Sequence, residues 1–199
     1  MRSVPRVHVV TSDRVVSRRG FTEVAKDIAR SAAALQLRTR LWSGRDLQAM
    51  AETIARDVPN AHLYINDRVD VAVAAGTEGV HLPSTGLPPD LVRREFGDGI
   101  VIGQSVHSES EAQHAGDLGA DYVFLGPIWQ TTSHPDRPPL GPHALEVRSS
   151  ARIVAIGGIT PDRARVCREA GAHGVAVISA VWDETDPTSA LPLLLGIFD

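Results

Sequence analysis

Short runs of apolar residues, rich in β-branched side chains, alternate with longer segments of mixed polarity along the whole chain. Runs of this kind, bounded by glycine and polar residues, are typical of strands that are buried on both faces of a parallel sheet. We therefore predict strands at eight places: residues 7–10, 34–38, 62–65, 79–82, 100–104, 122–126, 152–157 and 174–178.

The segments between these runs have the periodicity of amphipathic helices. The first places its apolar residues on one helix face, at Phe21, Val24, Ala25, Ile28, Ala29 and Ala32. The second repeats this spacing at Leu47, Met50, Ala51, Ile54 and Val58. Three helix starts are marked by the capping boxes Ser43–Asp46 and Ser108–Glu111, and by a cap residue before proline at Thr160–Pro161.

Eight buried strands separated by amphipathic helices predict an α/β fold, a closed (β/α)8 TIM barrel, as a single domain over residues 1–199. The alternative is an open, doubly wound sheet. That fold usually carries a G-x-G-x-x-G fingerprint after its first strand, whereas this chain has VHVVTSDR there. The barrel is therefore the preferred interpretation.

Composition and charge narrow the possible partners. The formal net charge is -4 without a long basic run, which argues against nucleic acid. No stretch has the roughly 18 consecutive apolar residues of a membrane helix, and the N-terminal residues lack the apolar core of a signal peptide. We expect a cytoplasmic protein that binds a small molecule, with no membrane partner and with a homo-oligomer as an open possibility.

The scarcity of cysteine and lysine excludes two kinds of chemistry. The single cysteine, Cys167, can form neither an internal disulfide nor a multi-cysteine metal site. The single lysine, Lys26, lies in the first predicted helix and not at a strand end, which argues against Schiff-base catalysis. No His, Asp or Glu spacing resembles a zinc site, so we predict no metal ligands.

The last two predicted strands end in the segments AIGGIT and AVISA, at residues 155–160 and 176–180. In this barrel the loops after strands seven and eight commonly bind phosphate through backbone N–H groups and a helix N-terminus. Gly157, Gly158, Ile178 and Ser179 are therefore candidate phosphate ligands. The alternative is that the two glycines form only a tight turn.

A second candidate site follows the second strand, in the segment QLRTR. Alternation along a strand puts Gln36, Arg38 and Arg40 on one side, where two guanidinium groups suit a carboxylate or a phosphate. A structural ion pair, for example between Arg38 and Asp67, is the alternative.

Two histidines are candidates for proton transfer. His107 directly follows the fifth strand, and His134 lies in a proline-rich segment at residues 129–141 that is longer than the neighbouring loops. A structural role for each histidine is the alternative.

Three long segments resemble the thiamin phosphate synthase/TenI superfamily in order and spacing: INDRVDVAVAAGTEGVHL, IGQSVHSESEAQHAGDLGADYVFLGPIWQTTSHPDRPPLG and IVAIGGITPDRARVCREAGAHGVAVISAVW. The resemblance implies a (β/α)8 barrel that handles the phosphorylated thiazole and pyrimidine precursors of thiamin. It also implies substrate-binding roles for Gln36, Arg38, Arg40, Asn66, Asp67, Ser105, Thr131 and Ser133.

Synthases of this superfamily couple hydroxymethylpyrimidine pyrophosphate to thiazole phosphate, with Mg²⁺ bridging the pyrophosphate. The chain keeps much of their pattern, at Gln36, Arg38, Asn66, Asp67, His81, Gly126, Pro127, Ile128 and Thr131. It departs where Arg40 replaces a lysine, Pro83 a glycine, Gly86 a metal-binding aspartate, and Ser133–His134 a Thr-Lys pair.

TenI-type members are thiazole tautomerases that move a proton without a metal. Residues 80–84, 105–108 and 157–163, and the R-x-R spacing of Arg38 and Arg40, look like TenI, so we expect a thiazole tautomerase, an isomerase, with no cofactor. Pro127 replaces the TenI histidine, so His134 or His107 would carry the proton. The alternatives are a thiamin phosphate synthase, which would need Mg²⁺, and a non-catalytic regulatory protein that binds thiazole phosphate.

Overall fold

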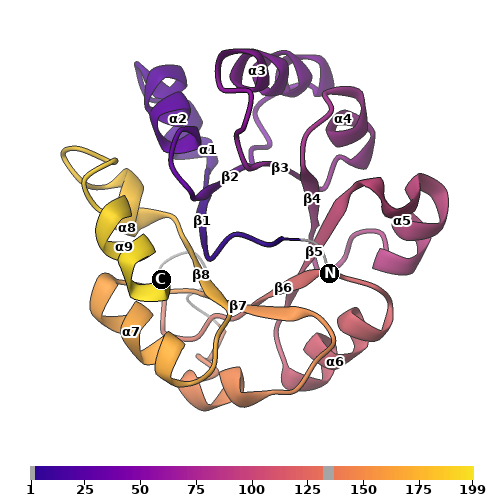
Figure 1. Cartoon of the computed structure of the whole chain (residues 1–199), viewed down its shortest axis with the longest axis vertical. Coiled ribbons are helices and arrows are strands. Elements are labelled where there is room, and N and C mark those ends of the chain that lie inside the picture. The colour runs from indigo at the N-terminus through magenta and orange to yellow at the C-terminus, as the bar shows by residue number, and fades with distance from the viewer. Residues whose placement is uncertain (1–2, 132–136) are drawn as a thin grey trace.

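A computed structural model describes residues 3–131 and 137–199 of the chain. The strands formed by these residues are parallel and close into a barrel in chain order, with β8 paired to β1 (Figure 1). They are β1 Val7–Val10, β2 Ala34–Leu37, β3 Leu63–Asn66, β4 Gly79–Leu82, β5 Val101–Val106, β6 Tyr122–Leu125, β7 Arg152–Ile156 and β8 Gly174–Val177. The predicted (β/α)8 barrel is confirmed, and every predicted strand is present.

The helices form a ring outside the strands (Figure 1). They are α1 Asp13–Val16, α2 Phe21–Ala29, α3 Gly44–Asp57, α4 Val69–Ala74, α5 Pro89–Phe96, α6 Glu109–Asp117, α7 Pro161–Glu169, α8 Ser179–Trp182 and α9 Leu191–Phe198. Two 3₁₀ turns, η1 Gly97–Gly99 and η2 Pro142–Glu146, complete them. In the described part of the β6–β7 connection, η2 stands where the other connections have an α-helix.

The predicted caps start their helices. Ser43 and Asp46 form a reciprocal capping box at α3, and the Thr160 hydroxyl caps α7 before Pro161. Ser108 caps α6, but the carboxylate of Glu111 accepts from the backbone N–H of His107 instead of completing the box. This difference ties the first residue after β5 to the helix that follows it.

Apolar side chains pack in two layers, one on each side of the strands. The larger layer lies between the strands and the helices and contains, for example, Ile28, Ile54 and Trp182. The smaller layer fills the inside of the barrel, where Tyr64, Tyr122 and Phe124 are buried. Gly79 and Gly103 face these two tyrosine rings, and a Cβ at either glycine would overlap a ring. The two glycines therefore let a small barrel hold aromatic residues.

The segment before β1 crosses the end of the barrel at which the strands begin (Figure 1). Val4 is buried in the inner layer, and its carbonyl oxygen lies 2.9 Å from Nε2 of His173. The carbonyl oxygen of Pro5 lies 3.1 Å from Nε2 of His8. These contacts close one end of the barrel and leave the other end, at the carboxyl ends of the strands, for a ligand.

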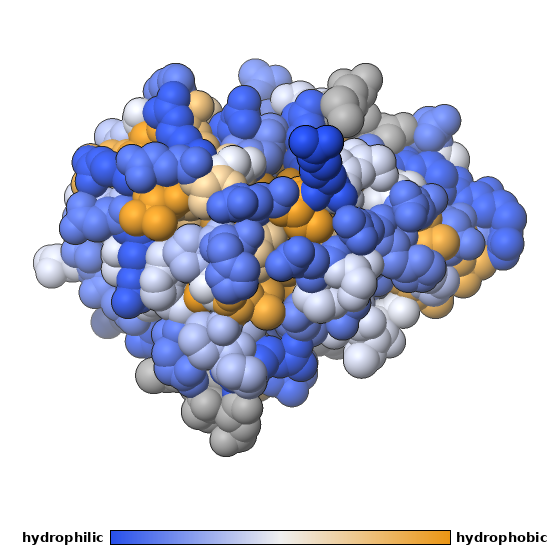
Figure 2. All heavy atoms as spheres, turned by 90° about the horizontal axis from the view of Figure 1, so that it is seen from below, coloured by the Kyte–Doolittle hydropathy of each residue, from blue (hydrophilic) through white to orange (hydrophobic). Residues whose placement is uncertain are grey.

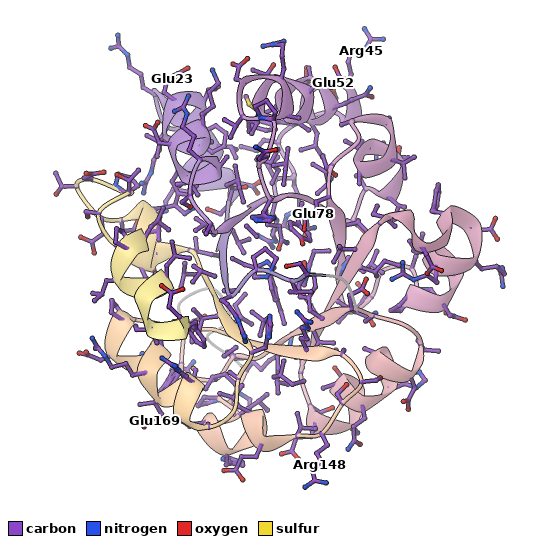
Figure 3. All side chains as sticks on the ribbon, in the orientation of Figure 1. Glu23, Arg45, Glu52, Glu78, Arg148 and Glu169 are labelled. Carbon is purple, nitrogen blue, oxygen red and sulfur yellow. The ribbon has the colours of Figure 1, made fainter. Side chains whose placement is uncertain are left out.

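Charged residues lie mainly on the outside. Among those labelled in Figure 3, Glu78 lies over the barrel, whereas Glu23, Glu52 and Glu169 lie at its outer edge. Glu78 contacts His62 Nδ1 at 2.6 Å and accepts a hydrogen bond from the Tyr64 hydroxyl. On the face shown in Figure 2, apolar side chains reach the surface only in patches broken by hydrophilic ones. No helix formed by the described residues is long and apolar enough to cross a membrane.

Candidate active site

Polar residues on neighbouring strands form two hydrogen-bonded groups that the strand register places side by side, and we call them together the polar network. Gln36 at the end of β2 donates from Nε2 to Oδ1 of Asn66 at the end of β3, at 3.1 Å. Asn66 is in register with His81 on β4, because the parallel pairing of these strands places the two residues opposite each other. His81 in turn lies 2.8 Å, through Nε2, from Oγ of Ser105 on β5. Three predicted substrate-binding residues are thus brought together.

His81 is the buried centre of this network. Its Nδ1 lies 3.2 Å from the hydroxyl of Tyr122 on β6, and only 1% of the residue is exposed. Burial lowers the pKa of His81 well below its usual value, and the nearby His8 and Arg38 add to the effect. A neutral imidazole has one donor and one acceptor nitrogen, which matches two hydroxyl partners. His81 therefore orients the Ser105 hydroxyl.

Gln36 carries an unpaired hydrogen-bond acceptor near the carboxyl ends of the strands, the end of the barrel that we call the mouth. The residue is 1% exposed, and its Oε1 has no hydrogen-bond partner within the part of the chain that the structure describes. A buried amide oxygen without a partner loses its interaction with water without compensation. A ligand that donates an N–H or O–H group to Oε1 would restore the missing bond.

The two arginines of the QLRTR segment differ in exposure. Arg38 is half-buried, and the buried Thr11 hydroxyl bonds to both its backbone N–H and its carbonyl oxygen. Arg40 has an 87% exposed side chain, and its backbone N–H donates to Asp13 Oδ1 at 2.7 Å. Because β2 ends at Leu37, strand alternation ends before Arg38 and does not fix the directions of the two side chains.

Arg38 is the less exposed of the two arginines that follow β2. It forms no ion pair with Asp67, whereas Nε of Arg40 lies 3.9 Å from Oδ2 of Asp13, so the structural alternative drawn from the sequence is observed for Arg40 and not for Arg38. A half-buried guanidinium group next to the polar network suits an anionic ligand.

Asp67 is the carboxylate at this mouth that suits a metal ion. Among the described non-glycine residues it alone has a positive φ, 67°, and its N–H donates to the His81 carbonyl oxygen at 2.8 Å. No three His, Cys, Asp or Glu residues of the described chain form a metal-binding group. At Gly86, where the synthase pattern has a second aspartate, an added Cβ would lie 2.8 Å from the ring of Pro83. The single carboxylate of Asp67 is enough to hold Mg²⁺ when phosphate groups of a substrate supply the other oxygen ligands.

The predicted phosphate ligands lie on adjacent strand ends. Gly157 and Gly158 have φ values of 98° and 66°, a left-handed backbone that favours glycine. Because Ile156 pairs with Ala176, continuing the register by two residues brings Gly158 to the level of Ile178, next to Ser179. The backbone N–H of Gly158 donates to no other described residue. These are the features expected of a backbone site for phosphate.

His107 is held by the loop after β6. Its Nδ1 lies 2.6 Å from the carbonyl oxygen of Gly126, which precedes Pro127 in a cis peptide bond. Thr131 is partly exposed at the end of the described part of this loop, whereas Ser133 and His134 lie outside the described residues. Sequence reasoning singled out His107 as a proton carrier, and the geometry gives it a structural partner as well.

Two features of the mouth were missed from the sequence as site residues. His81 and Tyr122 form part of the network through their side chains, and the signal available was their inward position in the strand alternation. Arg163, in the first turn of α7, donates from Nη1 to the carbonyl oxygen of Gly158 at 2.7 Å. An arginine three residues after a helix cap gives no such signal by itself.

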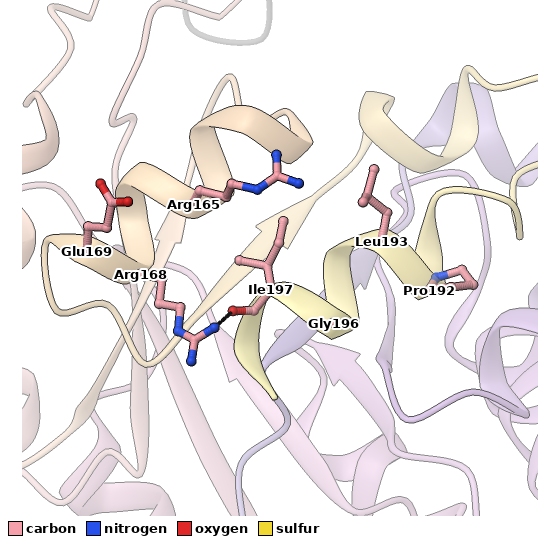
Figure 4. Close-up of a pocket in the computed structure, with 7 residues that line it drawn as sticks. All are labelled: Arg165, Arg168, Glu169, Pro192, Leu193, Gly196 and Ile197. Atoms are coloured by element: carbon pink, nitrogen blue, oxygen red, sulfur yellow. Dashed lines mark hydrogen bonds between the residues drawn. The ribbon is translucent and has the colours of Figure 1, made fainter.

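A separate hollow lies on the outside of the barrel, between α7 and α9 (Figure 4). It is lined by Arg165, Arg168, Glu169, Pro192, Leu193, Gly196 and Ile197. The Arg168 guanidinium bonds to the carbonyl oxygen of Ile197 and so holds the two helices together. Because none of these residues lies at a strand end, the hollow is not part of the mouth.

Comparison with known proteins identifies the family. A family model described as thiamine monophosphate synthase matches residues 7–181. A thiamine-phosphate synthase of Methanoculleus marisnigri is 43% identical over 92% of this chain and 90% of its own length. One from Roseiflexus sp. is 38% identical over 96% and 84%. A solved thiamine phosphate pyrophosphorylase from Pyrococcus furiosus superposes with a TM-score of 0.83 at 30% identity, covering 98% of this chain and 95% of that one.

These relatives overturn the expectation of a TenI-type thiazole tautomerase. The expectation gave too much weight to single replacements. Arg40 keeps the positive charge of the lysine it replaces, Asp67 remains as a carboxylate, and Pro127, which cannot move a proton, is part of the synthase pattern. The fold, the polar mouth and the relatives together show that the chain belongs to the thiamine monophosphate synthase family, whose members are enzymes of thiamine biosynthesis.

Proposed function

We propose that this protein is a thiamine-phosphate synthase, a transferase. It joins the methylene carbon of hydroxymethylpyrimidine pyrophosphate to the ring nitrogen of thiazole phosphate. The new C–N bond forms from the nitrogen lone pair, the C–O bond to pyrophosphate breaks, and pyrophosphate leaves with that electron pair. The reaction needs no oxidant or reductant.

The observation that carries this proposal is the presence of two anion-binding features at one barrel mouth. Arg38 follows β2, and the Gly157–Gly158 backbone follows β7. In the ring of strands these positions are separated by β1 and β8. A mouth with a cation on one side and free backbone N–H groups on another suits two phosphorylated substrates that meet between them.

The network across β2 to β6 supports a role for this chain in holding the pyrimidine. The free Oε1 of Gln36 is a buried acceptor, and the pyrimidine substrate carries an exocyclic amine that can donate to it. The Ser105 hydroxyl, oriented by His81, is a second polar group available to the ring. Matching a buried acceptor with a ligand donor both binds the ring and fixes its orientation.

Arg38 and Asp67 support the handling of pyrophosphate. Arg38 would bind its oxygens and stabilise the negative charge that grows as the C–O bond breaks. Asp67 is the residue that would hold Mg²⁺, which, when bound, supplies further positive charge for the leaving group. Thiazole phosphate would bind by its phosphate to Gly157, Gly158, Ile178 and Ser179.

The test is turnover by the purified protein. Both substrates are mixed with Mg²⁺, and thiamin phosphate and pyrophosphate are measured by chromatography. We expect equal amounts of both products, and loss of both on adding EDTA. A Gln36→Leu variant removes the unpaired acceptor together with the hydrogen bond that Nε2 donates to Asn66, so its folding is checked by circular dichroism. The folded variant should show a raised KM for the pyrimidine substrate only. Absence of thiamin phosphate from the wild-type reaction would refute the proposal.

A further inference from the structure

The loop after β6 and the loop after β7 are joined by backbone hydrogen bonds beyond the ends of the strands. The N–H of Ile128 donates to the carbonyl oxygen of Ile156 at 2.9 Å, and the N–H of Trp129 donates to that of Gly157 at 3.2 Å. The pairing of β6 with β7 thus continues into the segment that leads to Thr131 and into the glycines of the phosphate site.

Arg163 holds both loops from outside. Its Nη1 donates to the Gly158 carbonyl oxygen at 2.7 Å, and its Cζ lies 5.1 Å from the ring centroid of Trp129. A guanidinium group at this distance from an indole ring makes a cation–π contact. One half-buried side chain therefore bridges the two loops.

The contact is tight enough to fix the glycine backbone. A Cβ added to Gly158 would lie 2.9 Å from Cβ of Trp129 and 3.2 Å from Nη1 of Arg163. Glycine populates more backbone conformations than any other residue, so two consecutive glycines need external contacts to hold one conformation. In a trans peptide the C=O and the following N–H point in opposite directions. Fixing the Gly158 carbonyl group therefore fixes the N–H of Ile159 on the other side of the peptide.

The charge of Arg163 is already used within the protein. Its guanidinium group bonds to a carbonyl oxygen and stacks on a ring, and it has no carboxylate partner among the described residues. Arg165, two residues further along α7, pairs instead with Asp162 on the helix surface at 2.9 Å and is half-exposed. Arg163 and Arg165, two of the three arginines of α7, thus differ in whether they contact the loop after β7.

We propose that Arg163 is a positioning residue for the phosphate site, and that its contact with Trp129 couples this site to the loop after β6. The inference rests on the proposed function, in that the ligand of the site is thiazole phosphate. Arg163 acts through Gly158 and Trp129 and does not touch the phosphate itself. Its loss should weaken the binding of thiazole phosphate and leave the pyrimidine side of the mouth intact.

The experiment compares Arg163→Met, Arg163→Lys and Trp129→Ala with Arg165→Met as the matched control. Steady-state assays give kcat and both KM values, and calorimetry gives the affinity for thiazole phosphate alone. We expect Arg163→Met to lower the affinity for thiazole phosphate roughly ten- to a hundredfold, the range for a lost charged hydrogen bond. The KM for the pyrimidine substrate should stay within about twofold, and Arg165→Met should match the wild type in every value.

The remaining variants separate positioning from direct contact. Arg163→Lys keeps a donor for Gly158 but loses the flat stacking group, so its affinity should lie between those of the wild type and Arg163→Met. The double variant Arg163→Met/Trp129→Ala should bind thiazole phosphate with about the affinity of the single variant that binds it less tightly, because both changes break the same bridge. Additive losses in the double variant would contradict the bridge.

Failure of this inference is distinguishable from failure of the proposed function. A wild type that binds thiazole phosphate but makes no thiamin phosphate refutes the function, and the calorimetric comparison still decides the role of Arg163. Unchanged affinity in folded Arg163→Met, an equal rise of both KM values, or no binding of thiazole phosphate by the wild type would overturn the inference. Circular dichroism and melting temperature establish folding for each variant.

Discussion

Nδ1 of His107 lies 2.6 Å from the carbonyl oxygen of Gly126, which joins the end of β5 to the first residue after β6. A carbonyl oxygen only accepts, so this nitrogen carries a proton and donates it. His107 therefore holds the start of the loop that contains Pro127 and leads to Thr131.

The first prediction tests whether His107 acts as this donor or carries a proton in the reaction. His107→Asn keeps an N–H donor near the place of Nδ1, and we expect its turnover to stay close to that of the wild type. His107→Ala loses the bond and should lower both turnover and stability, the latter by about 1 kcal/mol. Assays of kcat and urea denaturation check this. Equal loss of kcat in both variants would instead show that the imidazole itself takes part in proton transfer.

The second prediction concerns Arg38. Replacing it with Met keeps much of the stem and removes the guanidinium group, so affinity for the pyrimidine pyrophosphate should fall roughly ten- to a hundredfold. The melting temperature should change little, because Arg38 has no ion-pair partner among the described residues. Arg40→Met is the control, since its side chain is 87% exposed. A large drop in melting temperature with undiminished affinity would mean that Arg38 is structural.

The third prediction concerns Asp67 and Mg²⁺. Asp67→Asn removes the anionic oxygen but keeps a residue that tolerates the left-handed φ of 67°. We expect the Mg²⁺ concentration for half-maximal turnover to rise roughly ten- to a hundredfold, with stability unchanged. Asp70→Asn, which changes an exposed carboxylate paired with Arg68, should leave the Mg²⁺ requirement as it is. Titration of Mg²⁺ in the coupling assay decides between these outcomes.

The fourth prediction concerns stability in acid. Burial lowers the pKa of His8 to about 3, whereas an unfolded histidine titrates near pH 6.5. Between these values the unfolded chain binds a proton that the folded chain does not, so stability is complete above about pH 6.5 and falls as the pH falls. The free energy of unfolding falls by about 1.4 kcal/mol for each pH unit, which amounts to roughly 2 kcal/mol at pH 5.

His8→Gln removes this titration. Urea denaturation at pH 7.5 and pH 5 should show a smaller loss of stability in the variant, by roughly 2 kcal/mol. His81, whose pKa burial also lowers, continues to contribute in both proteins. Identical losses in the two proteins would show that His8 does not stay neutral in the folded state.

The strands and helix caps could be predicted because they depend on local pattern. The apolar run at 79–82 is β4 residue for residue, and Thr160 followed by Pro161 starts α7 as expected. The polar network could not be predicted, since the contact of His81 with Ser105 and Tyr122 depends on the register between strands and not on spacing along one of them. The contacts of Arg40 depend on where β2 ends and on Asp13, the first residue of α1.

The site residues after β7 show the same limit. Gly157 and Gly158 could be assigned to a phosphate site from the fold alone, because their place at the seventh strand end is a property of the barrel. The bridge from Arg163 to Trp129 joins side chains that are more than thirty positions apart in the sequence. The tautomerase expectation was wrong because it rested on a few replaced residues, whereas similarity to the synthases extends over nearly the whole chain.

Closure of the barrel floor by Val4 and Pro5 bears on the order of events in the proposed reaction. Molecules can enter and leave only past the rim, since the opposite end is filled by the chain itself. Gln36 is 1% exposed, so a pyrimidine held by its side chain would be enclosed by the protein. Under the proposed reaction we expect the pyrimidine to bind first and thiazole phosphate to bind over it. Pyrophosphate and thiamin phosphate must leave by the route through which the substrates came, so early loading of thiazole phosphate would obstruct turnover.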